Sequence, residues 1–159
     1  MKPLIIALVV MLAANPASAA ISGRITAVHD GDTVTLLTDE KQQIKVRLAE
    51  IDAPELKQPY GQKSKQGLSA LCFDKPASIE PVTKDRYGRT VARVTCAGVP
   101  ANKEMVRAGA AWVYRKYSDS PELLKLEEEA RAAHRGLWGL QPDQITPPWE
   151  WRKSKRTPE

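Results

Sequence analysis

Hydrophobic and polar residues alternate along the first half of the chain, in short runs separated by turn residues. The runs from Ile21 to Val28, Thr33 to Thr38 and Gln43 to Leu48 are rich in Val, Ile, Leu and Thr, and Asp30-Gly31 is a turn signal. A period of two residues is typical of strands with one buried face. The pattern therefore predicts a three-stranded meander.

A second group of elements follows. The stretch from Gly61 to Leu71 lacks proline and predicts a helix, and Asn102 to Ala108 predicts a short helix that Gly109 ends. Strands are predicted from Ala77 to Val82 and from Thr90 to Thr95.

The third predicted helix has the strongest signal. Ser120 is a good N-cap before Pro121, and the apolar residues after it recur at alternating spacings of three and four: Leu123, Leu126, Ala130, Ala133 and Leu137. Such a stripe faces a hydrophobic core. We interpret the acidic run from Glu127 to Glu129 as part of the solvated face.

Five strands with three interspersed helices indicate an α+β domain, a small closed or nearly closed barrel with helices packed on it. The 159 residues, 42% hydrophobic and 27% charged, suffice for one soluble domain, which we assign to residues 20–140. Residues 141–159 are rich in proline, tryptophan and basic residues, and we expect an extended tail, largely disordered after Trp151. We expect this basic tail to be solvated and to have no role. The alternative is that its cations attract it weakly to anionic lipid or polymer.

Residues 1–19 have the pattern of a secretory signal peptide. Lys2 precedes an apolar run of 11 residues from Leu4 to Ala14, and Ala17-Ser18-Ala19 supplies the small residues of a cleavage site. The run is shorter than the ~20 residues of a spanning helix, which argues against an uncleaved anchor. We therefore expect an exported protein, periplasmic or secreted, without stable membrane insertion.

The two cysteines, Cys72 and Cys96, lie 24 positions apart and fit an oxidising compartment. An even pair there favours a disulfide over two buried free thiols. Two isolated cysteines do not make a zinc site, because zinc takes four ligands.

Three short motifs carry candidate chemistry. They are Asp30-Gly31-Asp32-Thr33, Arg47-Leu48-Ala49-Glu50-Ile51-Asp52-Ala53-Pro54-Glu55 and Asp85-Arg86-Tyr87-Gly88-Arg89. Aspartates with nearby carbonyls suit a hard divalent cation such as calcium. A glutamate close by can orient or deprotonate a water, and arginines from two loops can clamp a phosphodiester. Taken together, the three motifs predict a phosphoryl-transfer site.

These motifs, in this order, make residues 22–139 similar to the thermonuclease family that includes staphylococcal nuclease. The resemblance implies an OB-fold barrel with three helices and a calcium-dependent nuclease that cleaves DNA and RNA. It implies Asp32, Asp52 and the carbonyl of Ala53 as calcium ligands, Glu55 as the general base or water-positioning residue, and Arg47 and Arg89 as phosphate-binding arginines. It places Arg86 and Tyr87 beside the substrate phosphate.

The chain departs from staphylococcal nuclease at several positions. Ala53 replaces a threonine, which a ligand using its backbone carbonyl tolerates. The tyrosines after the second helix align loosely, and we expect Tyr114 to line a base-binding wall and Trp112 to pack in the core. His29 and His134 have no motif role.

The leading hypothesis is an exported calcium-dependent endonuclease that works as a monomer on DNA and RNA. The alternative is a catalytically silent OB-fold module that binds nucleic acid. An intact set of motif residues favours the enzyme. The net charge of +5 hints only mildly at an acidic partner, whereas four cations against Asp85 between Lys84 and Arg93 place positive charge beside the predicted site.

Overall fold

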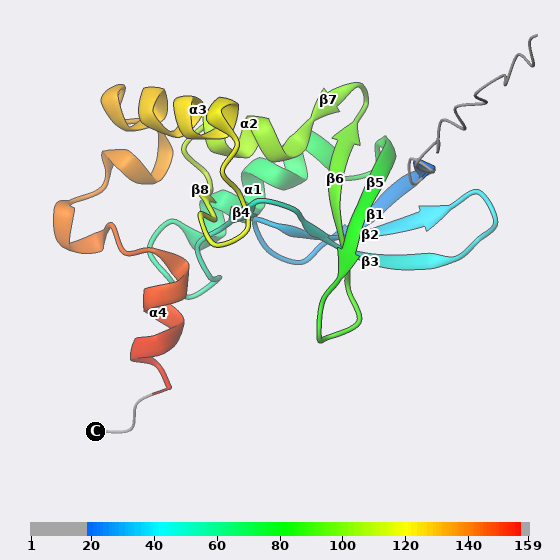
Figure 1. Ribbon diagram of the computed structural model, residues 1–159, viewed down its shortest axis with the longest axis horizontal. Coiled ribbons are helices and arrows are strands. Elements are labelled where there is room, and N and C mark those ends of the chain that lie inside the picture. Colours follow the sequence, from blue (N-terminus) through cyan, green and yellow to red (C-terminus); the bar gives the residue numbers. More distant parts are fainter. Residues whose placement is uncertain (1–18, 157–159) are drawn as a thin grey trace, which may run out of the picture.

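The computed structural model describes residues 19–156, so the signal peptide predicted for residues 1–19 lies almost entirely outside the described residues. The five long strands are β1 (Ile21–Val28), β2 (Thr33–Thr38), β3 (Gln43–Leu48), β5 (Pro76–Lys84) and β6 (Thr90–Cys96). They run in the order β3-β2-β1-β5-β6, and β3 also pairs with β6 in parallel, which closes the barrel. The predicted five-stranded barrel is confirmed (Figure 1).

Three short strands complete the β-structure of the described residues. β7 (Val99–Pro100) extends the edge beyond β6, and β4 (Ile51–Asp52) pairs with β8 (Trp112–Val113). The β4–β8 pair sets Asp52 opposite Trp112. The end of the second motif is therefore held against the segment that leads into the third helix.

The barrel interior follows the period of two in the sequence. Val34 and Leu36 of β2 and Val46 of β3 are fully buried, whereas their neighbours Thr35 and Lys45 are more exposed. Because successive side chains of a strand point to opposite faces, this alternation directs one face of each strand into the core.

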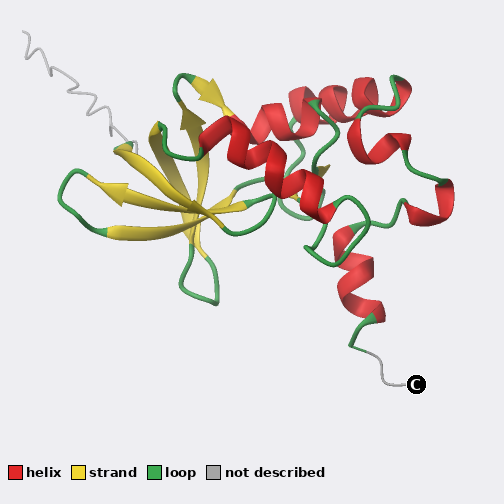
Figure 2. Ribbon diagram, turned by 180° about the vertical axis from the view of Figure 1, so that it is seen from behind, coloured by secondary structure: helices red, strands yellow, loops and turns green. Residues whose placement is uncertain are grey.

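Helices α1 (Gly61–Cys72), α2 (Ala101–Arg107) and α3 (Pro121–Ala132) gather at one side of the barrel, as Figure 2 shows. They match the three predicted helices, and the Ser120 hydroxyl caps α3 by accepting from the amide of Leu123. Cys72 and Cys96 form the predicted disulfide, which ties the end of α1 to the end of β6. A bridge of this separation stabilises a fold by about 3 kcal/mol.

The apolar stripe of α3 ends earlier than predicted. The helix stops at Ala132, and His134 and Gly136 adopt positive φ angles of 51° and 57°. Leu137 is therefore not on α3 but in the short 3-10 helix η1 (Gly136–Gly139), where it is still buried. The stripe correctly identified Leu137 as a core residue, although helix α3 ends before this position.

The prediction that Glu127 belongs to a solvated face is wrong. Its side chain is 1% exposed, and one carboxylate oxygen accepts from the amide of Val113 at 2.9 Å. The other oxygen accepts two hydrogen bonds of 2.9 Å from Arg115 and lies 3.5 Å from Arg131. Glu127 follows Leu126 on the edge of the apolar stripe, so the packing of β8 on α3 buries it.

The C-terminal segment is not an extended chain. After the 3-10 helix η2 (Pro142–Gln144), residues Pro148–Ser154 form helix α4, which Figure 1 shows beyond the main group of helices. Trp149 stacks parallel to Tyr114 with ring centroids 5.4 Å apart and lies edge-on to Trp112 at 5.7 Å. The basic composition indicated a solvated tail, but these aromatic contacts attach it to the domain.

Trp112 itself is buried, as predicted, in a small cluster with Ala130, Leu137 and Trp138. Across residues 19–156, none of the helices has the length and apolar composition that crossing a membrane requires.

Candidate active site

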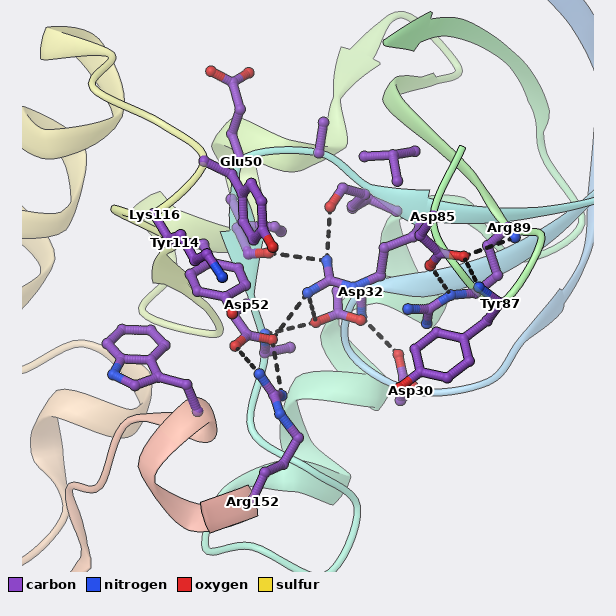
Figure 3. A pocket seen from close by; sticks show the side chains of 18 of the residues that line it. Asp30, Asp32, Glu50, Asp52, Asp85, Tyr87, Arg89, Tyr114, Lys116 and Arg152 are labelled. Carbon is purple, nitrogen blue, oxygen red and sulfur yellow. Dashed lines mark hydrogen bonds and ion pairs between the residues drawn. The ribbon is translucent and has the colours of Figure 1, made fainter. Parts of the chain in front are cut away.

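The three motifs meet in one cleft of about 840 Å³. Its lining comes from the β1–β2 turn, the β3–β4 region and the segment after it, the β5–β6 turn, the segment after β8, and α4 with the residues that follow it. Figure 3 shows Asp32 and Asp52 at its centre, with Asp85, Tyr87 and Arg89 on one side and Arg152 reaching in from α4. The lining includes all the predicted site residues: Asp32, Arg47, Asp52, Ala53, Glu55, Arg86, Tyr87, Arg89 and Tyr114.

Arg47 holds the two aspartates together. Its Nη2 atom lies 2.9 Å from Oδ1 of Asp52 and 3.2 Å from Oδ2 of Asp32. Its Nη1 atom donates to the carbonyls of Leu48 and Ile51. The guanidinium therefore also fixes the bend between β3 and β4, which turns Asp52 back toward Asp32.

The Asp30-Gly31-Asp32 turn is shaped by close packing. Asp30 accepts a hydrogen bond of 2.9 Å from the amide of Asp32. A Cβ atom on Gly31 would lie 1.9 Å from Oγ of Ser64 on α1 and 2.7 Å from Cβ of Ala53. Glycine is thus required because the turn presses against α1, and this contact brings Asp32 beside the second motif.

Burial raises the pKa of Asp32 to about 6. The positive charge of Arg47 and a 2.7 Å hydrogen bond from the amide of Ala53 to Oδ2 partly offset that effect. Burial also raises the pKa of Asp52, which is 1% exposed. Burying two carboxyl groups side by side costs desolvation free energy, so this pair indicates a functional site rather than an interaction that stabilises the fold.

The raised pKa of Asp32 predicts a pH-dependent stability effect. The folded chain holds this proton more tightly than the unfolded chain, so ionisation lowers the free energy of unfolding as the pH rises from about 4 to above 6. Replacing Asp32 with Asn should therefore stabilise the metal-free protein at pH 8, on the order of 2 kcal/mol, while activity is lost.

Urea denaturation in chelator at pH 8 and pH 4 measures this effect. The advantage of the variant should shrink toward zero at pH 4, where Asp32 is protonated in the folded wild type. A variant that is less stable than wild type at pH 8 would show that ionised Asp32 stabilises the fold.

The third motif forms the turn between β5 and β6. Asp85 accepts from the amides of Tyr87 and Arg89 and from Nε of Arg89 at 2.7 Å. Gly88 has a φ of 80°, which glycine adopts without strain. Arg89 also donates to the Thr33 hydroxyl at 3.3 Å, so this turn is joined to the start of β2.

Three side chains on this turn, those of Arg86, Tyr87 and Arg89, line the cleft. Tyr87 is 66% exposed, and the guanidinium carbons of Arg86 and Arg89 lie 4.9 Å and 5.7 Å from its ring centroid. The turn thus presents two cations and an aromatic ring on the side of the cleft across from α4. Asp85 has no role in our sequence interpretation, yet it is the acceptor that organises the turn.

Sequence reasoning missed Arg152. Its guanidinium pairs with Oδ2 of Asp52 at 2.7 Å and with Oε1 of Glu55 at 2.8 Å. The expectation that the C-terminal cations are solvated is wrong for this residue, because it pairs with two acids of the cleft. The basic run at residues 152–156 was visible in the sequence, but its contact with residues about 100 positions away was not.

Comparison with known proteins agrees with this geometry. The model of the family described as staphylococcal nuclease homologue matches residues 45–139. The chain belongs to the staphylococcal nuclease family. Membership identifies it as a nuclease that hydrolyses phosphodiester bonds, as the motifs predict.

Three family relatives cover most of the chain. A protein named as an uncharacterized endonuclease of Haemophilus influenzae is 44% identical over 84% of this chain and 74% of its own length. One of the same name from Escherichia coli is 43% identical over 85% of this chain and 87% of its own length. The micrococcal nuclease of Shigella flexneri is 36% identical over 94% of this chain and 91% of its own length.

The donor set fits a hard divalent cation. Asp32, Asp52 and Glu55 offer carboxylates and Ala53 a carbonyl, and calcium prefers oxygen ligands in irregular arrangements. Within residues 19–156, no three His, Cys, Asp or Glu side chains form a metal-binding group by themselves. In this site the acids are bridged instead by arginines, Arg47 between the two aspartates and Arg152 between Asp52 and Glu55.

The family match ends at residue 139, before η2 and α4. Trp149 and Arg152 therefore lie outside the matched region although they line the same cleft. Sequence motifs alone did not associate either residue with this nuclease site.

Proposed function

We propose that this protein is an exported, calcium-dependent nuclease that hydrolyses DNA and RNA by in-line attack of water. The observation that carries the proposal is the gathering of Asp32, Arg47, Asp52, Glu55 and Arg89 around one cleft. Each type of residue alone is common on protein surfaces. Their meeting from three separate motifs, with two acids buried at the centre, is what a phosphoryl-transfer site requires.

The substrate phosphate is held by cations. Arg89, oriented by Asp85, and Arg86 and Tyr87 on the same turn offer donors to phosphate oxygens along one side of the cleft. A planar guanidinium presents paired donors that match a phosphate. Arg47, in contact with both aspartates, adds positive charge where the negative charge of the transition state develops.

Glu55 orients the attacking water and takes its proton. It is 41% exposed at its side chain, so water reaches its carboxylate. Asp32, Asp52 and the carbonyl of Ala53 are the residues that would hold calcium, which when bound supplies charge stabilisation at the phosphate. Tyr114 lines the cleft wall in a parallel stack with Trp149, and this aromatic pair provides a surface against which a neighbouring base packs.

Two features support export. The first 19 residues have the pattern of a signal peptide, and the disulfide between Cys72 and Cys96 is of a kind that persists in oxidising compartments. We expect the protein to work as a monomer, because the three motifs of this chain already meet in one cleft.

A cleavage assay tests the proposal. Purified mature protein is incubated with single-stranded DNA, duplex DNA and RNA, in calcium or in excess chelator, and the fragment ends are determined. We expect cleavage in calcium and loss of cleavage in chelator, restored by added calcium. Equal cleavage in chelator would rule out calcium dependence, and binding in a gel shift without cleavage would favour the silent OB-fold module instead.

A further inference from the structure

Arg152 contacts one proposed calcium ligand, Asp52, and the proposed water-orienting residue, Glu55. Its Nη2 atom lies 2.7 Å from Oδ2 of Asp52, and its Nη1 atom lies 3.2 Å from Oδ1 of the same carboxylate. The same Nη1 atom is 2.8 Å from Oε1 of Glu55. One guanidinium thus engages both oxygens of Asp52 and bridges them to Glu55 (Figure 3).

These contacts occupy the approach to Asp52. The carboxylate is 1% exposed, and its Oδ1 atom also faces Arg47 at 2.9 Å. Calcium binds carboxylate oxygens at about 2.3–2.6 Å, which would bring the ion close to a guanidinium already bonded to the same atoms. Two cations at that separation repel each other strongly in a partly buried site.

We propose that Arg152 is a built-in competitor for the cation site, so that calcium binds only when this side chain leaves Asp52 and Glu55. The inference rests on the proposed function, because it concerns the same carboxylates. The Arg152 contacts hold a calcium ligand and the water-orienting glutamate in one ion-pair network. While these contacts persist, Arg152 closes Asp52 to calcium and occupies one carboxylate oxygen of Glu55, which leaves Glu55 less free to orient water.

The surrounding structure lets Arg152 leave without unfolding α4. The side chain is 32% exposed, so open solvent is available beside it. The helix is anchored one turn earlier, where Trp149 stacks on Tyr114 with an interplanar angle of 2°. The residues before α4 are attached separately, by a hydrogen bond from the side chain of Gln58 to the carbonyl of Thr146. A change of the Arg152 side chain therefore frees Oδ2 of Asp52 and Oε1 of Glu55, while Arg47 stays on Oδ1 of Asp52 and Oδ2 of Asp32.

Competition of this kind sets a calcium threshold. Calcium must replace the favourable contacts of Arg152 as well as bind its own ligands, which weakens its apparent affinity. The nuclease should therefore need a higher calcium concentration than its carboxylates alone would require. Its activity is then confined to calcium-rich surroundings, such as those outside the cytoplasm.

Calorimetric titration with calcium, without nucleic acid, tests the competition. The proteins compared are the wild type, Arg152→Gln and the matched control Arg156→Gln, which removes one cation from the same segment. Arg156 also lines the cleft but takes part in none of the ion pairs found among residues 19–156. We expect Arg152→Gln to bind calcium about 10- to 100-fold tighter than wild type, and Arg156→Gln to change affinity less than about threefold.

Thermal unfolding of the same proteins provides the second measurement. In chelator, Arg152→Gln should unfold at a lower temperature than wild type, because Asp52 and Glu55 lose a partner. In saturating calcium the difference should disappear or reverse, which also establishes that the variant is folded.

The outcomes separate the competition from the proposed function. Calcium affinities for wild type and Arg152→Gln within about threefold of each other, or an equal gain in Arg156→Gln, would overturn the competition and leave the calcium-dependent nuclease intact. No heat of calcium binding together with no calcium-induced rise in the unfolding temperature, in any of the three folded proteins, would contradict the calcium site itself.

Discussion

Replacing Glu55 with Gln is expected to lower kcat for DNA cleavage by about 10²–10⁴-fold. The amide keeps the size of the side chain and can still contact Arg152, but it cannot accept a proton from the attacking water. The measurement is the initial rate on single-stranded DNA at saturating calcium and substrate. Because Glu55 is 41% exposed at its side chain, the substitution should leave the thermal unfolding temperature nearly unchanged.

Glu50 offers a matched control for this experiment. It also lines the cleft, but its carboxylate pairs with Arg93 at 2.8 Å and accepts from the Ser118 hydroxyl at 3.1 Å. Glu50→Gln makes the same chemical change away from Asp32 and Asp52, and it should alter kcat by less than about threefold, as expected for a group outside the reaction. If the two substitutions lower kcat equally, the loss comes from the general electrostatics of the cleft. If Glu55→Gln keeps the wild-type kcat, Glu55 does not take the proton from the attacking water.

Replacing Glu127 with Ala should lower the free energy of unfolding by about 3–5 kcal/mol. The buried carboxylate accepts from the amide of Val113 and from Arg115, so alanine leaves a buried backbone donor and a cation without a partner. Urea denaturation measures the change. The neighbouring Glu128 is exposed, and Glu128→Ala should change stability by less than about 0.5 kcal/mol.

A milder variant links this stability effect to the active site. Glu127→Gln retains an oxygen that can accept from Val113 but loses the charge that holds Arg115 and Arg131. Val113 belongs to β8, which pairs Trp112 with Asp52 of β4. The Gln variant should be destabilised less than the Ala variant. A Glu127→Ala protein as stable as wild type would show that β8 is held by its other contacts alone.

Local sequence patterns were sufficient for most of the secondary structure. The alternation in β2 and β3 and the turn residues between strands predict the barrel, because a strand buried on one face needs apolar side chains at every second position. The Ser120-Pro121 cap predicts the start of α3. Its end was predicted too late because the positive φ angles of His134 and Gly136 are set by the packing of the next turn.

Ordered motifs were likewise sufficient to predict which residues meet in the cleft, while the chemical role of each residue stays a prediction. Asp32, Asp52, Glu55, Arg47 and Arg89 all line the cleft, as the motif resemblance implies. The motifs contained no information on how these groups are paired. Arg47 contacts both aspartates, and Gly31 packs against Ser64, only because β2, β3 and α1 are brought together by the fold.

The sequence by itself determined the barrel, its three covering helices and the motif residues that meet in the cleft, because these depend on periodicity and on short motifs. Tertiary structure alone decided three further properties: the burial of Glu127, the folding of the C-terminal segment as α4, and the placement of Arg152 on Asp52 and Glu55. Each depends on contacts between residues far apart in the chain. A charged residue in a local pattern looks solvated until distant elements bury it or supply its partner.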